Sequence, residues 1–252
     1  CDFCAGSSLP WARRPLSSVI EELQHVRAQG VRNVFFADYT FTTERRYVLD
    51  LCRAMEDMSL GLRWTVLARP DQLDEEMVRA MAASGCGLVQ LGVESGDDAI
   101  LERYRKGFTV AQVRRAFALC REVGLPTLGF FIIGLPGQDE ASVERTIDLA
   151  LELDPDLASF AVPTPDPGTV LERVMGAGEV HSTSHPIVES GLLDEEAILR
   201  LHATAVWRFY SRPSLLVRQL AASASPGDLK RKLLGGARLL GGALRKRRLS
   251  RS

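Results

Sequence analysis

Five short apolar runs at a regular spacing place the strongest constraint on how this chain folds. They occupy residues 33–37, 62–68, 88–93, 127–134 and 157–162, and their starts are 29, 26, 39 and 30 residues apart. An amphipathic segment follows each run, and a strand, a helix and two loops together need roughly 30 residues. The pattern therefore predicts repeated βα units that build a parallel sheet. The continuous apolar residues 130–133 are typical of a strand that is covered on both faces.

Helix-end signals lie between these runs. Ser18 begins a Ser-Val-Ile-Glu capping box, and Asp74 and Thr109 each precede an amphipathic segment. Gly30 and Gly124 follow two of the helical patterns and can adopt the left-handed conformation that ends a helix. We therefore expect helices to begin just after Ser18, Asp74 and Thr109.

The alternation of strand and helix patterns stops beyond residue 170. A helical pattern runs from Asp194 to Tyr210, and Pro213 follows it. We predict a barrel domain over residues 1–180, a helical extension over 181–225 and a basic, disordered tail over 226–252. No apolar run approaches the ~20 residues that a membrane-spanning helix needs. The five scattered cysteines do not form a disulfide framework, so we expect a cytoplasmic protein.

The charges are distributed unevenly. The whole chain has a formal net charge of −1, yet residues 212–252 contain eleven Lys or Arg and one acidic residue, Asp228. A solvated terminus is the plainer interpretation of this basic segment, and weak contact with a membrane surface is the alternative. No nucleic-acid partner is expected, because aromatic residues do not alternate with these charges.

The chain begins with Cys1-Asp2-Phe3-Cys4, a Cys-x-x-Cys pair. The spacing fits a zinc half-site, a redox pair, part of an iron–sulfur loop, or two unremarkable cysteines. A zinc site needs further Cys or His ligands, and a redox pair belongs in a thioredoxin-like domain; the sequence shows neither. Cys52 and Cys120 fall in apolar helical patterns and are expected to be buried, whereas Cys86 begins a strand pattern.

Polar residues and glycine turns follow the apolar runs. Asp38 follows the first run, Arg69 the second, Glu94 and Ser95 the third, and Gly134 ends the fourth. The carboxyl ends of parallel strands share one edge, so these residues are predicted to meet at a polar site. The alternative is that the two carboxylates cap helices or pair with Arg69, and that the glycine merely turns the chain.

Several stretches occur in an order that resembles the radical S-adenosylmethionine (SAM) superfamily. They are Cys-Asp-Phe-Cys at 1–4, residues 34–42, Gly-Val-Glu-Ser-Gly at 92–96, residues 129–137, and Pro-Asp-Pro-Gly-Thr at 165–169. The resemblance covers residues 1 to about 170. It implies a partial (β/α)6 TIM-like barrel, here without its first strand, followed by the helical extension.

The resemblance also implies a four-iron four-sulfur cluster held through Cys-x-x-x-Cys-x-x-Cys. Cys1 and Cys4 match the second and third cysteines of that motif, so the first would lie upstream of this chain. We therefore expect the chain by itself to hold the cluster poorly and to be inactive. Cys86 is an improbable substitute ligand, since the start of a strand is far from the cluster end.

The same resemblance assigns positions around SAM. It implies that Phe3 lies near the adenine and Asp38 near the methionine amino group, and it names no catalytic residue. The other positions are near the ribose or carboxylate (Arg69, Glu94 and Ser95), or offer backbone to the adenine (Gly129, Gly134 and Pro165).

The implied activity is reductive cleavage of SAM to a 5'-deoxyadenosyl radical that modifies a substrate. Residues 38–42, 92–96 and 208–213 with the basic tail most resemble the group with a cobalamin-binding domain, which includes methyltransferases and ring-forming enzymes. The partners implied are a small-molecule or lipid-like substrate and an electron donor such as flavodoxin or ferredoxin. Two alternatives stay open: a non-catalytic barrel remnant that binds or assembles with a partner, and a cluster-free aldolase-like barrel. The latter normally needs a lysine at a strand end, and none of the five runs ends in one.

Overall fold

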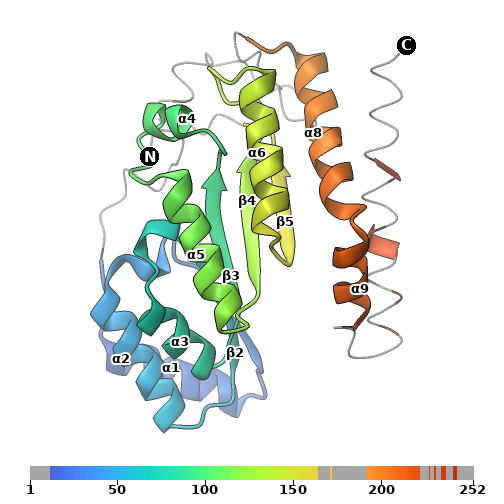
Figure 1. The fold of residues 1–252 in the computed structure, drawn as a ribbon. Helices are drawn as coiled ribbons and strands as arrows, with labels where there is room; N and C mark the ends of the chain where they lie inside the picture. The colour runs from blue at the N-terminus through green and yellow to red at the C-terminus, as the bar shows by residue number, and fades with distance from the viewer. Residues whose placement is uncertain are drawn as a thin grey trace, which may run out of the picture.

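The computed structural model describes residues 12–163 and 192–221, together with Leu171 and a few positions beyond 226. Five strands form one parallel sheet in the order β1-β2-β3-β4-β5 (Figure 1). Their bounds are β1 Asn33–Phe36, β2 Arg63–Ala68, β3 Cys86–Glu94, β4 Thr127–Ile132 and β5 Leu157–Ala161. Each strand lies within two residues of a predicted run, so the parallel sheet is confirmed.

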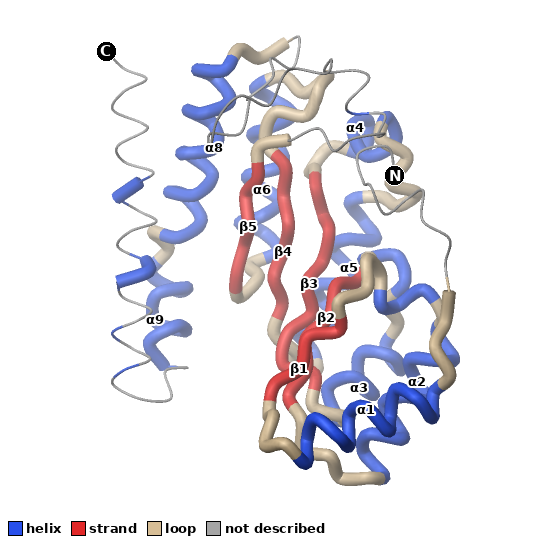
Figure 2. Tube along the Cα trace, turned by 180° about the vertical axis from the view of Figure 1, so that it is seen from behind, coloured by secondary structure: helices blue, strands red, loops and turns tan. Residues whose placement is uncertain are grey.

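Helices alternate with the strands. They are α1 (Leu16–Ala28), α2 (Arg45–Asp57), α3 (Glu75–Ala83), α4 (Asp98–Arg103), α5 (Val110–Glu122), α6 (Glu140–Leu153), α8 (Glu195–Tyr210) and α9 (Pro213–Ala221), with 3-10 turns η2 (Phe41–Thr43) and η3 (Pro70–Gln72). Helices α2, α3, α5 and α6 lie against one face of the sheet, and from behind the strands stand in front of them (Figure 2). This arrangement is the expected partial barrel, with a helical extension in α8 and α9.

Most of the predicted helix ends are confirmed. The Asp74 carboxylate accepts a hydrogen bond from the Met77 amide at 2.9 Å, and Thr109 forms a complete capping box at the start of α5. Gly30 and Gly124 follow α1 and α5 with φ of +88° and +67°. These ends were predictable because a cap depends on residues that are neighbours in sequence.

The predicted start of the first helix is wrong. Helix α1 begins at Leu16, two residues before Ser18, and has no side-chain cap. Pro15 is the N-cap residue, with φ of −55° and ψ of 138°, and its carbonyl accepts the first helical hydrogen bond from the Val19 amide at 3.2 Å, so Ser18 already lies within the helix. The Ser18 hydroxyl instead accepts a hydrogen bond from Arg14 at 3.1 Å.

Helix α8 packs on the same core as the sheet. Phe131 of β4 stacks on Phe160 of β5 at 5.3 Å between ring centroids, and Phe160 meets Phe209 of α8 at 5.9 Å. Leu201 and Phe209 belong to the main buried cluster with the strand residues. The domain boundary predicted near residue 180 lies outside the described residues and stays a prediction, as does the tail.

The two faces of the sheet differ in burial. On β2, the helix-facing residues Trp64, Val66 and Ala68 are buried, whereas Thr65 and Leu67 on the opposite face are half-buried. The register places Leu67 beside Gln90 of β3 and Gln90 beside Leu128 of β4. Leu88 of β3 and Phe130 and Ile132 of β4 are half-buried on the same face, so the face away from the helices is largely apolar although Thr65 and Gln90 lie on it. No helix among the described residues is long and apolar enough to cross a bilayer.

Candidate functional site

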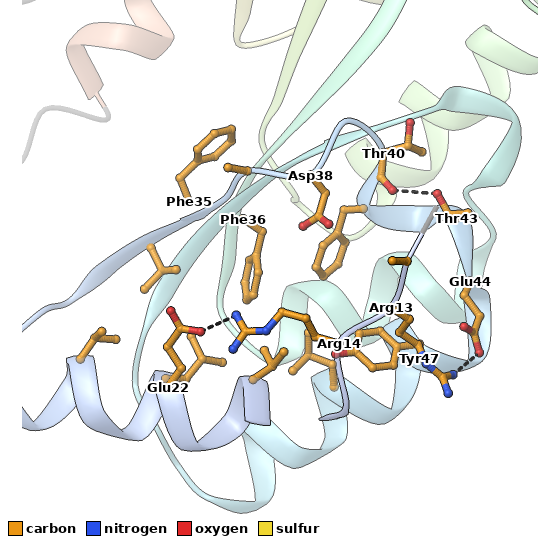
Figure 3. A pocket seen from close by; sticks show the side chains of 18 of the residues that line it. Arg13, Arg14, Glu22, Phe35, Phe36, Asp38, Thr40, Thr43, Glu44 and Tyr47 are labelled. Carbon is orange, nitrogen blue, oxygen red and sulfur yellow. Dashed lines mark hydrogen bonds and ion pairs between the residues drawn. The ribbon is translucent and has the colours of Figure 1, made fainter. Parts of the chain in front are cut away.

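The Asp38 carboxylate stands exposed just after β1. It forms no hydrogen bond or ion pair with the described residues, and Figure 3 shows it pointing toward a groove of about 630 Å³. Thr40 and Phe41 border the groove beside it, and α1 and α2 form the opposite wall. An exposed carboxylate with a free hydrogen-bonding capacity suits an ammonium group.

The groove follows the open edge of β1. Its border carries the ion pairs Arg14–Glu22 at 2.5 Å and Arg13–Glu44 at 2.7 Å. The Phe36 ring points into the groove, whereas the half-exposed Phe35 points away (Figure 3). The groove thus runs along the whole edge of β1, between this strand and helices α1 and α2.

The Arg69 guanidinium follows β2 and is firmly held. Its Nε and Nη2 donate to the two oxygens of Asp71, each at 3.0 Å, and Nη2 also donates to the Lys106 carbonyl at 2.5 Å. The guanidinium lies 5.2 Å from the centroid of the Phe108 ring. Arg69 therefore presents a fixed positive group at the rim, and the alternative in which it pairs with Asp38 or Glu94 is wrong.

Glu94 ends β3 with an unusual backbone and a buried partner. Its φ is +66°, in the left-handed region that non-glycine residues seldom adopt. The Lys106 ammonium donates to Glu94 Oε1 at 3.2 Å. The Glu94 side chain is 12% exposed and the Lys106 side chain is 8% exposed. Neither Asp38 nor Glu94 caps a helix, because Glu44 and Asp97 occupy the N-cap positions of α2 and α4.

Ser95 lies inside the rim. It is fully buried, its hydroxyl accepts from the Asp97 amide at 3.2 Å, and it lies 3.4 Å from the Thr146 hydroxyl. The Gln138 amide nitrogen approaches it at 3.5 Å. This placement favours a structural role, and a direct contact between Ser95 and a ligand stays a prediction.

The turn after β4 is fixed by Gln138. Its side-chain oxygen accepts from the amides of Gly134 at 2.9 Å and Leu135 at 2.8 Å. Gly134 has φ of +93°, and a Cβ there would lie 3.0 Å from Ile198 of α8. Gly129 is buried, and a Cβ there would lie 2.7 Å from the Phe131 ring. The two glycines thus permit close packing, and their contact with an adenine stays a prediction.

Asp97 joins two loops of the rim. It caps α4 through the Ala99 amide at 3.0 Å and pairs with Arg145 of α6 at 2.5 Å. Burial by itself would raise the pKa of Asp97, but hydrogen bonds from the Arg145 guanidinium and the Ala99 amide outweigh it, so the pKa lies below its usual value. The charged carboxylate therefore holds α4 against α6.

The predicted cluster ligands Cys1 and Cys4, and the predicted contacts Phe3 and Pro165, lie outside the described residues. The described part of the chain holds no group of three or more Cys, His, Asp or Glu suited to a metal. Cys52, Cys86 and Cys120 are buried there, as expected for Cys52 and Cys120. Burial raises the pKa of Cys86 to about 12, so this thiol does not suit a thiolate ligand.

Sequence reasoning missed Lys106, Asp71 and Gln138. Asp71 lies two residues after Arg69, and Gln138 directly follows the glycine turn, so both lie close in sequence to predicted residues. Lys106 lies twelve residues beyond Glu94, and nothing local marks it. Lys106 is buried at the rim but comes from the loop between α4 and α5, since none of the five strands ends in a lysine.

Comparison with known proteins identifies the family. The model of the radical SAM superfamily matches residues 1–150. This chain belongs to the radical SAM superfamily. It is 32% identical to an uncharacterized methyltransferase of Pyrococcus horikoshii, over 87% of this chain and 50% of that protein.

Two further similarities extend this result. The chain is 25% identical to the anaerobic magnesium-protoporphyrin IX monomethyl ester cyclase of Rubrivivax gelatinosus, over 86% of this chain and 41% of the cyclase. The structure of the cobalamin-dependent SAM radical enzyme OxsB, with aqua-cobalamin and SAM bound, aligns with a TM-score of 0.68 and 17% identity, over 99% of this chain and 44% of OxsB. At this level of identity, the similarity to OxsB shows that the two proteins share a fold. The chain spans about half, or less, of the length of these proteins.

Proposed function

We propose that this chain forms the SAM-binding part of a radical SAM enzyme. The exposed Asp38 carboxylate carries the proposal, because it stands after β1 without a hydrogen-bond partner among the described residues and can accept hydrogen bonds from the methionine ammonium. Arg69, fixed by Asp71, presents a positive charge for the SAM carboxylate, and Glu94 presents a carboxylate oxygen for the ribose.

Cys1 and Cys4 are the residues that would hold the iron–sulfur cluster. When bound, the cluster supplies the single electron that cleaves SAM. The described residues have the complementary task, which is to fix the position of the SAM groups at the rim. These residues match the functional groups of SAM. The carboxylates of the rim can bind the ammonium and the ribose hydroxyls, and the guanidinium of the rim can bind the SAM carboxylate.

The reaction we favour is cobalamin-dependent methyl transfer or ring formation on a small molecule. The methyltransferase and cyclase similarities support it, and so does the largely apolar sheet face with Gln90 between Leu67 and Leu128. A face of this kind suits a substrate with an extended apolar or lipid-like part. An electron donor such as flavodoxin or ferredoxin and a cytoplasmic location complete the proposal.

The direct test is cleavage of SAM to 5'-deoxyadenosine by the intact, anaerobically reconstituted protein. We expect cleavage in the wild type and a rise of about tenfold or more in the KM for SAM in Asp38→Asn, because a charge-assisted hydrogen bond is lost. Asp57→Asn makes the same chemical change at an exposed site near the opposite ends of the strands and should leave KM unchanged. A wild type that binds a partner but does not cleave SAM would favour the non-catalytic remnant.

A further inference from the structure

A cavity of about 260 Å³ lies where β1, β2 and β3 begin, at the opposite end of the strands from Asp38. Asn33 and Arg63 are the first residues of β1 and β2, and they are direct neighbours in the parallel register. Thr65 of β2 lines the same cavity. An amide, a guanidinium and a hydroxyl therefore border one space at the amino ends of the strands.

An extra residue in β3 makes room for the Arg63 guanidinium. The register between β2 and β3 shifts at this point, and Gly87 is the additional residue of a β-bulge. A Cβ on Gly87 would lie 3.2 Å from both Nε and Nη2 of Arg63. The guanidinium thus lies against the sheet, over a residue that has no side chain to displace it.

The three polar side chains have no partner in the part of the chain that the structure describes. There, the side chains of Asn33, Arg63 and Thr65 form neither a hydrogen bond nor an ion pair, and no described residue that lines the cavity is acidic. By contrast, Arg208 of α8 pairs with two carboxylates of α6. The cavity therefore presents a positive charge that the described residues do not neutralise.

Apolar side chains lead from this cavity toward the carboxyl ends of the strands. Phe35 of β1 is 50% exposed, and Leu67 of β2 and Leu88 of β3 are half-buried on the face away from the helices. This face is turned toward the viewer in Figure 2. Leu67 lies four residues beyond Arg63, which is about 13 Å along a strand. A ligand on this face thus meets a cation at one end and an apolar surface along its length.

We propose that Arg63, together with Asn33 and Thr65, binds the carboxylate at the far end of a substrate whose apolar body lies on this face. That the ligand is a substrate rests on the proposed function. A guanidinium offers two parallel N–H groups that match the two oxygens of a carboxylate. Its single charge balances that of one carboxylate, and the neutral amide and hydroxyl add hydrogen bonds without further charge.

The test is the binding of decanoate to the intact protein, measured by calorimetry at low salt and below the concentration at which micelles form. Decanol, which has the same chain length without the charge, is the reference ligand. We expect the wild type to bind decanoate about tenfold or more tightly than decanol. Arg63→Met should remove most of this preference and leave the affinity for decanol unchanged. Decylammonium should bind the wild type more weakly than decanol, because Arg63 repels it.

Two further variants separate the guanidinium from charge in general. Arg63→Lys keeps the charge but loses the paired N–H groups, so it should retain only part of the preference. Arg115→Met removes an exposed arginine from α5, which covers the other face of the sheet, and should leave the preference unchanged. Since Arg63 is itself exposed, the thermal unfolding of its variants should match that of the wild type.

Three results would overturn the inference: no binding of decanoate to the wild type, equal affinities for decanoate and decanol, or a preference that survives in Arg63→Met. Any of these in a protein that cleaves SAM would leave the proposed function intact. Binding of decanoate through Arg63 in a protein that does not cleave SAM would support the carboxylate site and overturn the proposed function alone.

Discussion

At the scale of single residues, the rim depends on buried polar side chains that connect its loops. Gln138 is fully buried, and its oxygen accepts two backbone amides of the turn after β4. Ser95 connects the end of β3 to α6 through Thr146. The exposed groups of the site are thus held by residues that have no solvent contact.

Gln138→Ala should therefore lower the free energy of unfolding by about 2–4 kcal/mol, because it leaves the amides of Gly134 and Leu135 buried without an acceptor. Urea unfolding measures the loss. Gln24→Ala alters an exposed glutamine in α1 that holds no backbone group and should cost much less. An equal loss in the two variants would contradict the role assigned to Gln138.

The buried thiols predict a stability that falls at alkaline pH. Burial raises the pKa of Cys52 to about 11 and those of Cys86 and Cys120 to about 12, above the ordinary value of 9.0. Between the ordinary thiol pKa and these raised values, the unfolded chain loses protons that the folded chain keeps. The free energy of unfolding therefore decreases as pH rises through this range. The stability that the protonated buried thiols contribute is fully present below the ordinary thiol pKa of 9.0.

Urea unfolding at about pH 8 and about pH 10 tests this dependence. We expect a smaller decrease in a variant with all three cysteines changed to alanine, although that variant starts from a lower stability. Tyr210 and Tyr47 also have a raised pKa through burial and account for a remaining slope. A slope unaffected by the cysteine substitutions would contradict the assignment.

At the scale of elements, the two edge strands of the sheet have different neighbours. Helix α8 covers β5: the Tyr210 hydroxyl donates to the Ala158 carbonyl at 2.5 Å and accepts from the Ala158 amide at 3.2 Å. His202 Nε2 lies 2.9 Å from the Phe160 carbonyl, which can accept but not donate. These side chains take the place of a neighbouring strand, whereas the edge of β1 borders the groove.

Tyr210→Phe should lower the free energy of unfolding by about 1–3 kcal/mol, because two backbone groups of β5 lose their partner. Hydrogen exchange of the Ala158 amide should accelerate at the same time. Tyr39→Phe removes a hydroxyl from a side chain that is 66% exposed and should have little effect. Unchanged protection of Ala158 would show that α8 does not stabilise this edge.

At the scale of the whole molecule, charge is separated along the chain. Residues 212–252 carry eleven of the 31 basic residues and one of the 32 acidic residues. If the tail contacts anionic membranes, co-sedimentation of the protein with phosphatidylserine vesicles should be appreciable at low salt and fall as salt rises. Neutral vesicles are the control. Absence of binding to anionic vesicles at low salt would end this proposal.

The sequence by itself determined the order and extent of the five strands, most helix ends and the polar character of the rim. These features depend on alternation, caps and glycines within a few residues of each other, so local pattern is sufficient. The misplaced start of α1 shows the limit of that reasoning. Pro15 is the N-cap residue of α1, so the helix begins two residues before the capping signal at Ser18.

The tertiary structure alone decided which charged groups meet. It paired Glu94 with Lys106 and Arg69 with Asp71, buried Ser95, and placed Tyr210 on the edge of β5. Such partners lie on different elements, and their contact depends on how helices and loops pack in three dimensions. A carboxylate at a strand end can be recognised in the sequence, but the residue that holds it is selected by the fold.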